Sequence, residues 1–486
     1  MVFSSLIFLL AFLPLNLFCY FFVDSIKARN TVLLVFSLIF YAWGEPVFVL
    51  ILIGMSFFCW LFSLYIEKYA ENKTGKKLFM ALAVVFCLGT IGFFKYGGFI
   101  TENLNAVIGS DALSFPKTTL PIGISFYTFQ LLTYVADVYR GEVPAQKKYA
   151  RVLLYAGLFH QCIAGPIVRY GDIENELTER SSDLQSISAG FSRFCAGLAK
   201  KAVLANACGA ASDALLVADS AVLDASSLSV LQSRSALTLW AGMAFYMLQI
   251  YLDFSAYSDM AIGLGLICGL HYKENFDYPY ISSSVTEFWR RWHISLGTFF
   301  RDYVYIPLGG NRKGTARQIF NLGVVWALTG LWHGASWNFV LWGLYFFIFL
   351  VLEKFVFGKF LEKTKALKHI YLLAVVYFGW VLFRFTETSH VGAVLRGMFC
   401  LNKNPLSTFE SRKFVFGYVL FFIICVIACT PVVKVASEIL NRKAKESRLG
   451  LYIARTVDVA LPVVLLLLSV LSLVGDSYNP FLYFRF

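Results

Sequence analysis

The chain has 486 residues, of which 58% are hydrophobic, 17% aromatic and only 15% charged. A soluble domain usually carries about 25% charged residues, so this composition excludes a soluble protein. The 49 Phe, 26 Tyr and 10 Trp recur in long uncharged runs, and 12 Pro are too few for a disordered or collagen-like chain. We therefore expect a membrane protein with many spans.

The 42 Lys and Arg exceed the 30 Asp and Glu, which gives a formal net charge of +12. In a soluble chain this excess would suggest a nucleic acid partner. Here most of it lies in short loops between apolar runs, where it sets membrane orientation, so we expect no nucleic acid partner. The 10 Cys mostly lie inside apolar stretches without CxxC or Cys/His spacing, which predicts small buried side chains and no metal site.

The first apolar run, residues 3–23, has no positive charge before it and no small-residue cleavage site, so we interpret it as a retained helix. Positive charges follow at Lys27 and Arg29 and again at 68–77. Both clusters fit the cytoplasmic side if the run between them is two helices broken at 44–46. This pattern predicts a multi-pass protein of the inner (cytoplasmic) membrane whose N-terminus lies outside the cytoplasm.

Further candidate segments follow when about 20 residues are required for each span. They lie at residues 78–95, 118–136, 150–168, 187–205, 236–252, 257–270, 318–331, 335–353, 370–385, 413–431 and 455–474. Several are too short or too polar to cross alone, and the runs 160–168 and 262–270 contain Gly or Pro, so we expect broken or re-entrant helices around a cavity. Residues 207–235, rich in Ala, Ser and Asp, predict a loop or a short surface helix.

The stretch 288–312 concentrates arginine beside aromatic residues in a chain that otherwise avoids charge. On one helix, Arg290, His293 and Arg301 would follow one another in a single stripe. Because guanidinium groups pair with phosphate in bidentate geometry, such a stripe could hold the phosphates of a coenzyme or a phosphopantetheine arm. The alternative is a juxtamembrane helix whose arginines, Arg291 among them, face lipid headgroups.

A second stretch, residues 326–343, places a single ionisable side chain, His333, in an uncharged span. Burial disfavours the imidazolium, so we expect a neutral ring, the form that can take a proton from a hydroxyl nucleophile. Gly330 and Gly334 would let another helix, or a substrate, approach the imidazole. The alternative is a core histidine hydrogen-bonded across helices among interfacial tryptophans.

Asp253 is the costliest of the remaining polar side chains to bury at membrane depth. It could orient a histidine or pair with an arginine of the stripe, and a structural ion pair is the alternative. The sequence contains no GxSxG, Walker A, HExxH or GxGxxG context that would support a hydrolase, nucleotide or zinc site.

Long ungapped strings resemble the membrane-bound O-acyltransferases, and within them the bacterial alginate-acetylating branch. The strings are YAWGEP (41–46), FFKYGGF (93–99), LPIGISFYTFQLLTYVADVYRG (120–141), IAGPIVRYGDI (163–173), YLDFSAYSDMAIGLG (251–265), NFDYPY (275–280), FWRRWHISLGTFFRDYVYIPLGGNR (288–312), LTGLWHGASWNFVLWG (328–343) and YNPFLYFRF (478–486). The resemblance covers nearly the whole chain and is densest over 41–345. One departure is Asn206, near a position where relatives usually have Asp.

The resemblance implies an all-α polytopic fold of about 11–13 transmembrane or re-entrant helices in a ring around a central tunnel. It implies one membrane domain over 1–486, with a catalytic core at 118–350 that holds both histidine motifs and with C-terminal helices at 351–486. By the same resemblance His333 is the catalytic base and His293 is a second catalytic histidine.

The implied reaction moves an acetyl group from a cytoplasmic thioester, acetyl-CoA or an acyl-carrier thioester, with no bound cofactor. The acceptor would be an extracytoplasmic polysaccharide, either an alginate-like exopolysaccharide or a cell-wall glycan, or an SGNH esterase-like partner protein that completes the transfer. Membrane lipids surround the protein, and no nucleic acid partner is expected. The substrate-binding residues would be Arg290, Arg291, Arg301, Asp253, Trp332 and Asn338.

Two alternatives remain open from the sequence. One is transfer of another acyl group, such as D-alanyl from a carrier protein to teichoic acid. The other is a transporter or flippase without chemistry, which usually shows matched broken helices in two halves. This chain shows no internal repeat, and both histidine motifs lie in one half.

Overall fold

The computed structural model describes residues 1–116, 118–218, 222–444, 446–475 and 482. Over these ranges the chain is helical or irregular and forms no strand, which confirms the predicted all-α fold. The string 478–486 lies outside the described residues except for Leu482. The helices group into two compact units, and the predicted partition at residues 118 and 350 stays a prediction.

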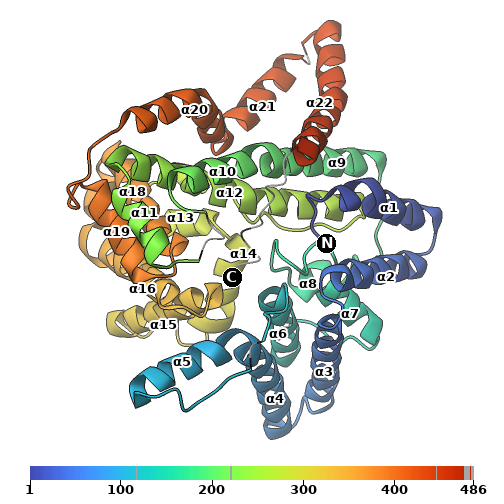
Figure 1. The fold of residues 1–486 in the computed structure, drawn as a ribbon. Helices are drawn as coiled ribbons and strands as arrows, with labels where there is room; N and C mark the ends of the chain where they lie inside the picture. The colour runs from blue at the N-terminus through green and yellow to red at the C-terminus, as the bar shows by residue number, and fades with distance from the viewer. Residues whose placement is uncertain (117, 219–221, 445, 476–481, 483–486) are drawn as a thin grey trace. The chain divides into compact units, whose positions relative to one another are not determined.

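The first unit comprises Met1–Phe194, Tyr257–Glu274 and Thr298–Val304. Its helices α3, α4 and α6 pack against one another, and α7 packs against both α2 and α3 (Figure 1). The elements wholly inside this unit are η1 (Phe8–Phe12), α1 (Leu13–Phe22), α2 (Ile26–Gly44), α3 (Val49–Lys68), α4 (Lys73–Ile91), η2 (Gly92–Tyr96), α5 (Gly97–Ile108), α6 (Ile124–Arg140), α7 (Tyr149–Gly157) and α8 (Tyr170–Ile173).

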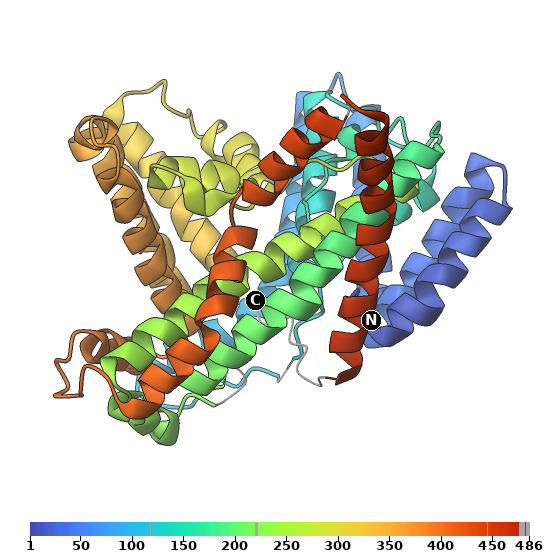
Figure 2. The ribbon, with the colours of Figure 1, turned by 90° about the horizontal axis from the view of Figure 1, so that it is seen from above.

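The second unit comprises Cys195–Ala256, Asn275–Gly297 and Tyr305–Phe486. Its helices α15 and α16 pack together, and so do α21 and α22, coloured red in Figure 2. Its elements are η3 (Lys200–Ala205), α10 (Asn206–Leu215), α11 (Ala225–Ser233), η4 (Pro279–Ile281), α13 (Val285–Arg291), α15 (Thr315–His333), α16 (Trp337–Leu352), η6 (Glu353–Phe357), α17 (Gly358–Glu362), α18 (Leu367–Arg384), α19 (Thr388–Met398), α20 (Phe409–Ala428), α21 (Val432–Ala444) and α22 (Arg448–Gly475). Four elements have residues in both units: α9 (Leu184–Ala199), α12 (Ala236–Ile267), α14 (Ile294–Phe300) and η5 (Arg301–Tyr305).

Within the described part of the chain, seven helical segments are long and apolar enough to cross a membrane, so the protein is a multi-pass membrane protein. They are Ile26–Gly44, Val49–Lys68, Lys73–Ile108, Trp337–Glu362, Leu367–Arg384, Phe409–Ala428 and Arg448–Gly475. The pair α11 and α12, bent by 114°, raises the number to eight if it is one span. Of the remaining predicted segments, 118–136, 150–168 and 187–205 form the shorter helices α6, α7 and α9, whereas 318–331 lies in the 19-residue α15, and 236–252 and most of 257–270 lie in the 32-residue α12.

Some predicted segments take a different form. The run 3–23 is helical over Phe8–Phe22, a stretch shorter than the seven spans. The run 160–168 is irregular, which confirms the predicted break, but α12 continues through 262–267. Gly263 does not break α12, since it brings the helix against α9: a Cβ there would lie 2.6 Å from the carbonyl oxygen of Gly190.

Over 207–235, where a loop or a short surface helix was predicted in place of a span, the structure has two short helices, α10 and α11, and neither by itself is among the seven spans. Residues 206–215 form α10, which buries one stripe of mostly small side chains that includes Cys208, Ala211 and Ser212. Small residues lower the hydropathy of a segment, but they also allow helices to pack closely, and this packing buries one stripe of α10. The 10 cysteines are free thiols, and eight of them are buried.

Candidate active site

The start of α13, the helix that carries the two adjacent arginines, is held by two caps. The Ser284 side chain accepts a hydrogen bond from the Glu287 N–H at 3.0 Å. The Glu353 carboxylate, which follows α16, accepts from the N–H groups of Val285 at 2.7 Å and Thr286 at 3.0 Å. These are donors that a helix leaves unsatisfied at its N-terminus, so Glu353 fixes α13 against α16.

The backbone adopts a left-handed conformation at His293, two residues after the end of α13. His293 has φ +46°, in the left-handed region, which for a residue other than glycine costs on the order of 1–3 kcal/mol. Asn275 holds the turn, since its carbonyl accepts from the Ile294 N–H at 2.9 Å and its side-chain oxygen accepts from the Ser295 N–H at 3.0 Å. The predicted continuous stripe from Arg290 to His293 and beyond is therefore wrong, because one helix ends and another begins at this turn.

Both predicted catalytic histidines contact Trp332. The His333 ring, at the end of α15, lies 4.9 Å from Trp332 between ring centroids, and the His293 ring lies 5.7 Å from it. The two imidazoles are almost completely buried, with 5% exposure for His333 and 2% for His293. Burial lowers the pKa of His293, which lies outside the seven spans, to about 3, so this ring is neutral at pH 7. The structure thus brings His293, Trp332 and His333 together.

Glycines bring α15 and α16 into direct contact beside His333. A Cβ at Gly330 would lie 2.4 Å from the carbonyl oxygen of Phe339, and one at Gly343 would lie 2.4 Å from that of Trp326. Of the two occupants expected beside Gly330, a helix or a substrate, the structure shows a helix. This contact allows Trp342 of α16 to pack against the His333 ring, at 4.9 Å between centroids.

Asn338 lies in the first turn of α16 and is buried. Its amide nitrogen donates to the carbonyl oxygen of Leu382 in α18 at 3.2 Å. The neighbouring Phe383 packs on the His333 ring at 5.1 Å between centroids. Asn338 therefore joins α16 to the part of α18 that covers His333.

The two arginines at the end of α13 differ in their surroundings. Arg291 forms ion pairs with Glu287 and with Asp277, each at 3.0 Å. These two carboxylates neutralise the Arg291 guanidinium, and the pair with Asp277 joins the end of α13 to the segment that precedes it. Arg290 is exposed, and the described residues offer it no carboxylate within ion-pair distance. Of this pair, Arg290 is the one able to meet an anionic ligand.

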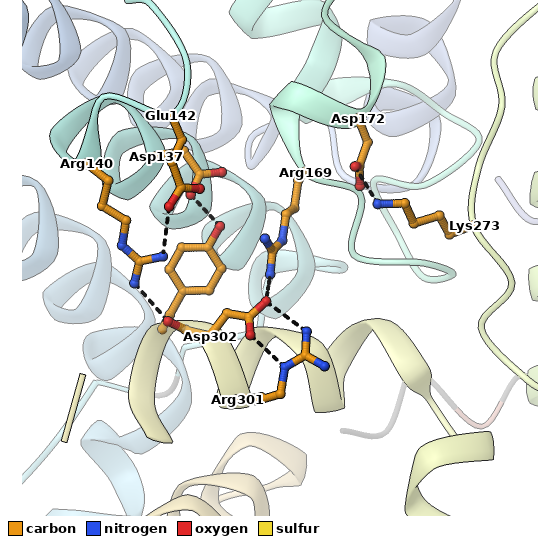
Figure 3. Close-up of polar contacts among 9 residues, drawn as sticks. Asp137, Arg140, Glu142, Arg169, Asp172, Lys273, Arg301 and Asp302 are labelled. Atoms are coloured by element: carbon orange, nitrogen blue, oxygen red, sulfur yellow. Dashed lines mark hydrogen bonds and ion pairs between the residues drawn. The ribbon is translucent and has the colours of Figure 1, made fainter. Parts of the chain in front are cut away.

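Arg301 belongs to the first unit, whereas both histidines belong to the second. Figure 3 shows Arg301 and Arg169 reaching Asp302, while Tyr303 donates to Asp137 at 2.5 Å. Burial opposes ionisation of Asp302, but the hydrogen bonds from Arg301 and Arg169 outweigh it and lower the pKa of this carboxyl. Residues of three motif strings thus meet in one cluster of ion pairs and hydrogen bonds.

Asp253 pairs with Lys201 at 2.7 Å, and the two side chains are 0% and 2% exposed. The other carboxylate oxygen accepts from the backbone N–H of Leu482 at 3.0 Å. An ion pair is confirmed, but its partner is a lysine and not an arginine of the stripe. Lys201, which lies in the π-helical turn η3, was not predicted as this partner; a lysine inside the apolar run 187–205 was the available signal.

Comparison with known proteins identifies the class. The family model of the membrane-bound O-acyltransferases matches residues 39–390, which include both histidines. The chain therefore belongs to this family and is an O-acyltransferase. It is 36% identical to a probable alginate O-acetylase of Pseudomonas putida over 100% of both chains.

Two further relatives carry different names. A peptidoglycan O-acetyltransferase of Helicobacter pylori is 32% identical over 83% of this chain and 80% of the relative. A teichoic acid D-alanyltransferase of Bacillus subtilis is 26% identical over 54% of this chain and 67% of the relative. The acyl group and the acceptor thus differ among proteins similar to this chain.

Proposed function

We propose that this protein transfers acetyl groups from a cytoplasmic thioester, acetyl-CoA or an acyl-carrier thioester, for O-acetylation of an extracytoplasmic polysaccharide. Full-length similarity to an alginate O-acetylase and extensive similarity to a peptidoglycan O-acetyltransferase support this substrate class. Within the chain, the observation that carries the proposal is the contact of two buried histidines, His293 and His333, with Trp332.

In the proposed reaction, the neutral imidazole of His333 takes the proton of the acceptor hydroxyl. The hydroxyl oxygen attacks the thioester carbonyl carbon, the carbon–sulfur bond breaks, and the sulfur leaves with the proton returned by the imidazolium. An ester forms, a thiol is released, and the base is regenerated. His293, held in a strained turn by Asn275, would orient the reacting groups.

Binding of the donor is proposed for Arg290, which is exposed and has no described carboxylate beside it. Trp332 and Asn338 would shape the site around His333 through the contacts given above. Arg291, Arg301 and Asp253 were predicted for the same task, but their ion pairs favour a positioning role.

The proposed setting is the cytoplasmic membrane, with the N-terminus outside and the cations at 27, 29 and 68–77 inside. The acceptor is either the glycan or an SGNH esterase-like partner that completes the transfer. D-alanyl transfer is the second candidate, favoured by the similarity to the teichoic acid enzyme over 54% of the chain. A transporter without chemistry does not fit membership in an acyltransferase family.

The test is replacement of His333 by Ala and by Gln in cells that lack the wild-type gene. Since a positioned base is worth about 10² to 10⁴ in rate, we expect at least a hundredfold loss of acetyl groups on surface glycans, measured by mass analysis, at equal protein level in the membrane. His390→Gln is the matched control, since His390 is equally buried in the same unit but hydrogen-bonds to Ser227 at 2.9 Å. Wild-type acetylation by His333→Ala would refute the assignment, and D-alanyl groups in place of acetyl would support the second candidate.

A further inference from the structure

A cavity of about 460 Å³ opens between α2 and α7 in the first unit. Three cations line it: Lys27 from α2, Lys148 at the start of α7, and Arg151 one turn later. No Asp or Glu is among its lining residues, and within the described chain none of the three cations forms an ion pair with a carboxylate. The cavity therefore carries uncompensated positive charge.

The two helices also point their N-termini toward the same end of this cavity. Their N-cap residues, Ser25 and Lys148, both line it. The helices run in the same direction, because Phe159, just beyond α7, donates to the hydroxyl of Ser37 in the middle of α2 at 3.0 Å. The N-terminus of α7 has no side-chain cap. The Arg151 N–H donates to the Lys148 carbonyl at 3.1 Å, and the N–H groups of Tyr149 and Ala150 remain available to an anion. Two positive helix ends thus add to the three cationic side chains.

Away from this charged end, the lining becomes apolar. Leu34 of α2 and Leu154 of α7 continue the cavity along the two helices. Because α2 is one of the seven spans, its N-terminal end lies where the membrane meets water. A ligand that fits both ends carries a negative charge at the surface and a hydrocarbon chain toward the membrane interior.

We propose that this cavity binds the headgroup phosphate of an anionic phospholipid, with the lipid chain along the apolar lining. In the membrane orientation proposed above, the N-terminal end of α2 faces the cytoplasm. A basic pocket at that surface suits such headgroups, because short-range pairing with the phosphate adds to the attraction between the cations and the negatively charged leaflet. A zwitterionic lipid offers the same phosphate, but its own cation would face Lys27, Lys148 and Arg151. The site is therefore expected to select phosphatidylglycerol or cardiolipin over phosphatidylcholine.

The experiment titrates the purified full-length chain in neutral detergent with dioleoyl phosphatidylglycerol and, separately, with dioleoyl phosphatidylcholine, and counts bound lipid by native mass spectrometry. The triple variant Lys27→Gln/Lys148→Gln/Arg151→Gln is expected to bind phosphatidylglycerol on the order of 100-fold more weakly. The control triple Lys68→Gln/Lys73→Gln/Lys77→Gln makes the same change in charge at exposed positions around the loop after α3 and should stay within about twofold of wild type.

Equal binding of the two lipids by the wild type would overturn the proposal, and so would an equal loss in both triple variants. Glycerol phosphate and inorganic phosphate form a third arm: displacement of the lipid by either at a similar concentration would identify a free phosphate as the ligand and refute the lipid assignment. Lys148→Gln alone, expected to weaken binding about fivefold, serves if the triple variant does not fold. The readout is lipid binding, so the result is independent of acetyl transfer.

Discussion

The buried ion pair between Lys201 and Asp253 offers the sharpest test of the tertiary structure. The two atoms lie 2.7 Å apart, and the side chains are 2% and 0% exposed, so water cannot compensate either charge alone. Lys201→Met leaves the Asp253 carboxylate with the Leu482 N–H as its remaining described partner. Removing one partner of such a pair costs about 3–5 kcal/mol of unfolding free energy.

The double variant separates charge pairing from packing. Lys201→Met/Asp253→Leu removes both charges and keeps similar volume, which for other buried pairs is often neutral. Here the Leu482 N–H loses its acceptor, and an unsatisfied buried donor costs about 1–3 kcal/mol. The double variant should therefore be more stable than Lys201→Met.

The assay is unfolding of the purified protein in detergent by denaturant titration, completed as a double-mutant cycle with Asp253→Leu. Lys77→Met, at an exposed position, is the control for loss of a lysine. If the double variant is as unstable as the sum of the two single variants, the ion-pair reasoning fails. Acetylation by the double variant adds a second readout: full activity assigns Asp253 to structure, whereas a stable but inactive protein supports its predicted place in substrate binding.

Three further outcomes follow from contacts in the structure. Gly330→Ala should destabilise the protein by about 1–3 kcal/mol, because α15 and α16 must separate to make room for the methyl group. Gly392→Ala is the control: no atom lies within 4 Å of a Cβ at this position, so this variant should be neutral or slightly stabilising. Thermal unfolding in detergent compares the two variants, and equal effects would contradict the close contact. Glu353→Ala should cost about 1–3 kcal/mol in the same assay because two N–H groups of α13 lose their acceptor, and an unchanged midpoint would exclude this cap. The pKa of the Asp302 carboxyl is lower in the folded state than the ordinary aspartate pKa of about 3.9. The ionised carboxylate therefore stabilises the fold fully above the ordinary pKa, and this stabilisation is lost as the pH falls through the pKa of the folded state. The difference in melting temperature between wild type and Asp302→Asn should therefore shrink between pH 6 and pH 3, and a constant difference would refute the linkage.

Much of the site was visible in the sequence because its chemistry is local. His333 stands out as a single ionisable residue in an uncharged run, and His293 as part of a dense arginine motif. Their common contact with Trp332 could not be predicted, because it depends on the left-handed turn at His293. That turn is held by Asn275, whose role has no local signature.

The membrane class, the all-α fold and the family could be predicted from the amino-acid sequence, because hydropathy is a local property and the motif strings are continuous. Which polar groups compensate one another depends on how distant segments pack in three dimensions. Lys201 pairs with Asp253, and Glu353 caps α13, across separations at which a single sequence carries no pairing information. For residues 207–235 the sequence predicted a loop or a short surface helix. Which side chains of α10 are buried depends on its packing against other helices, which hydropathy does not measure.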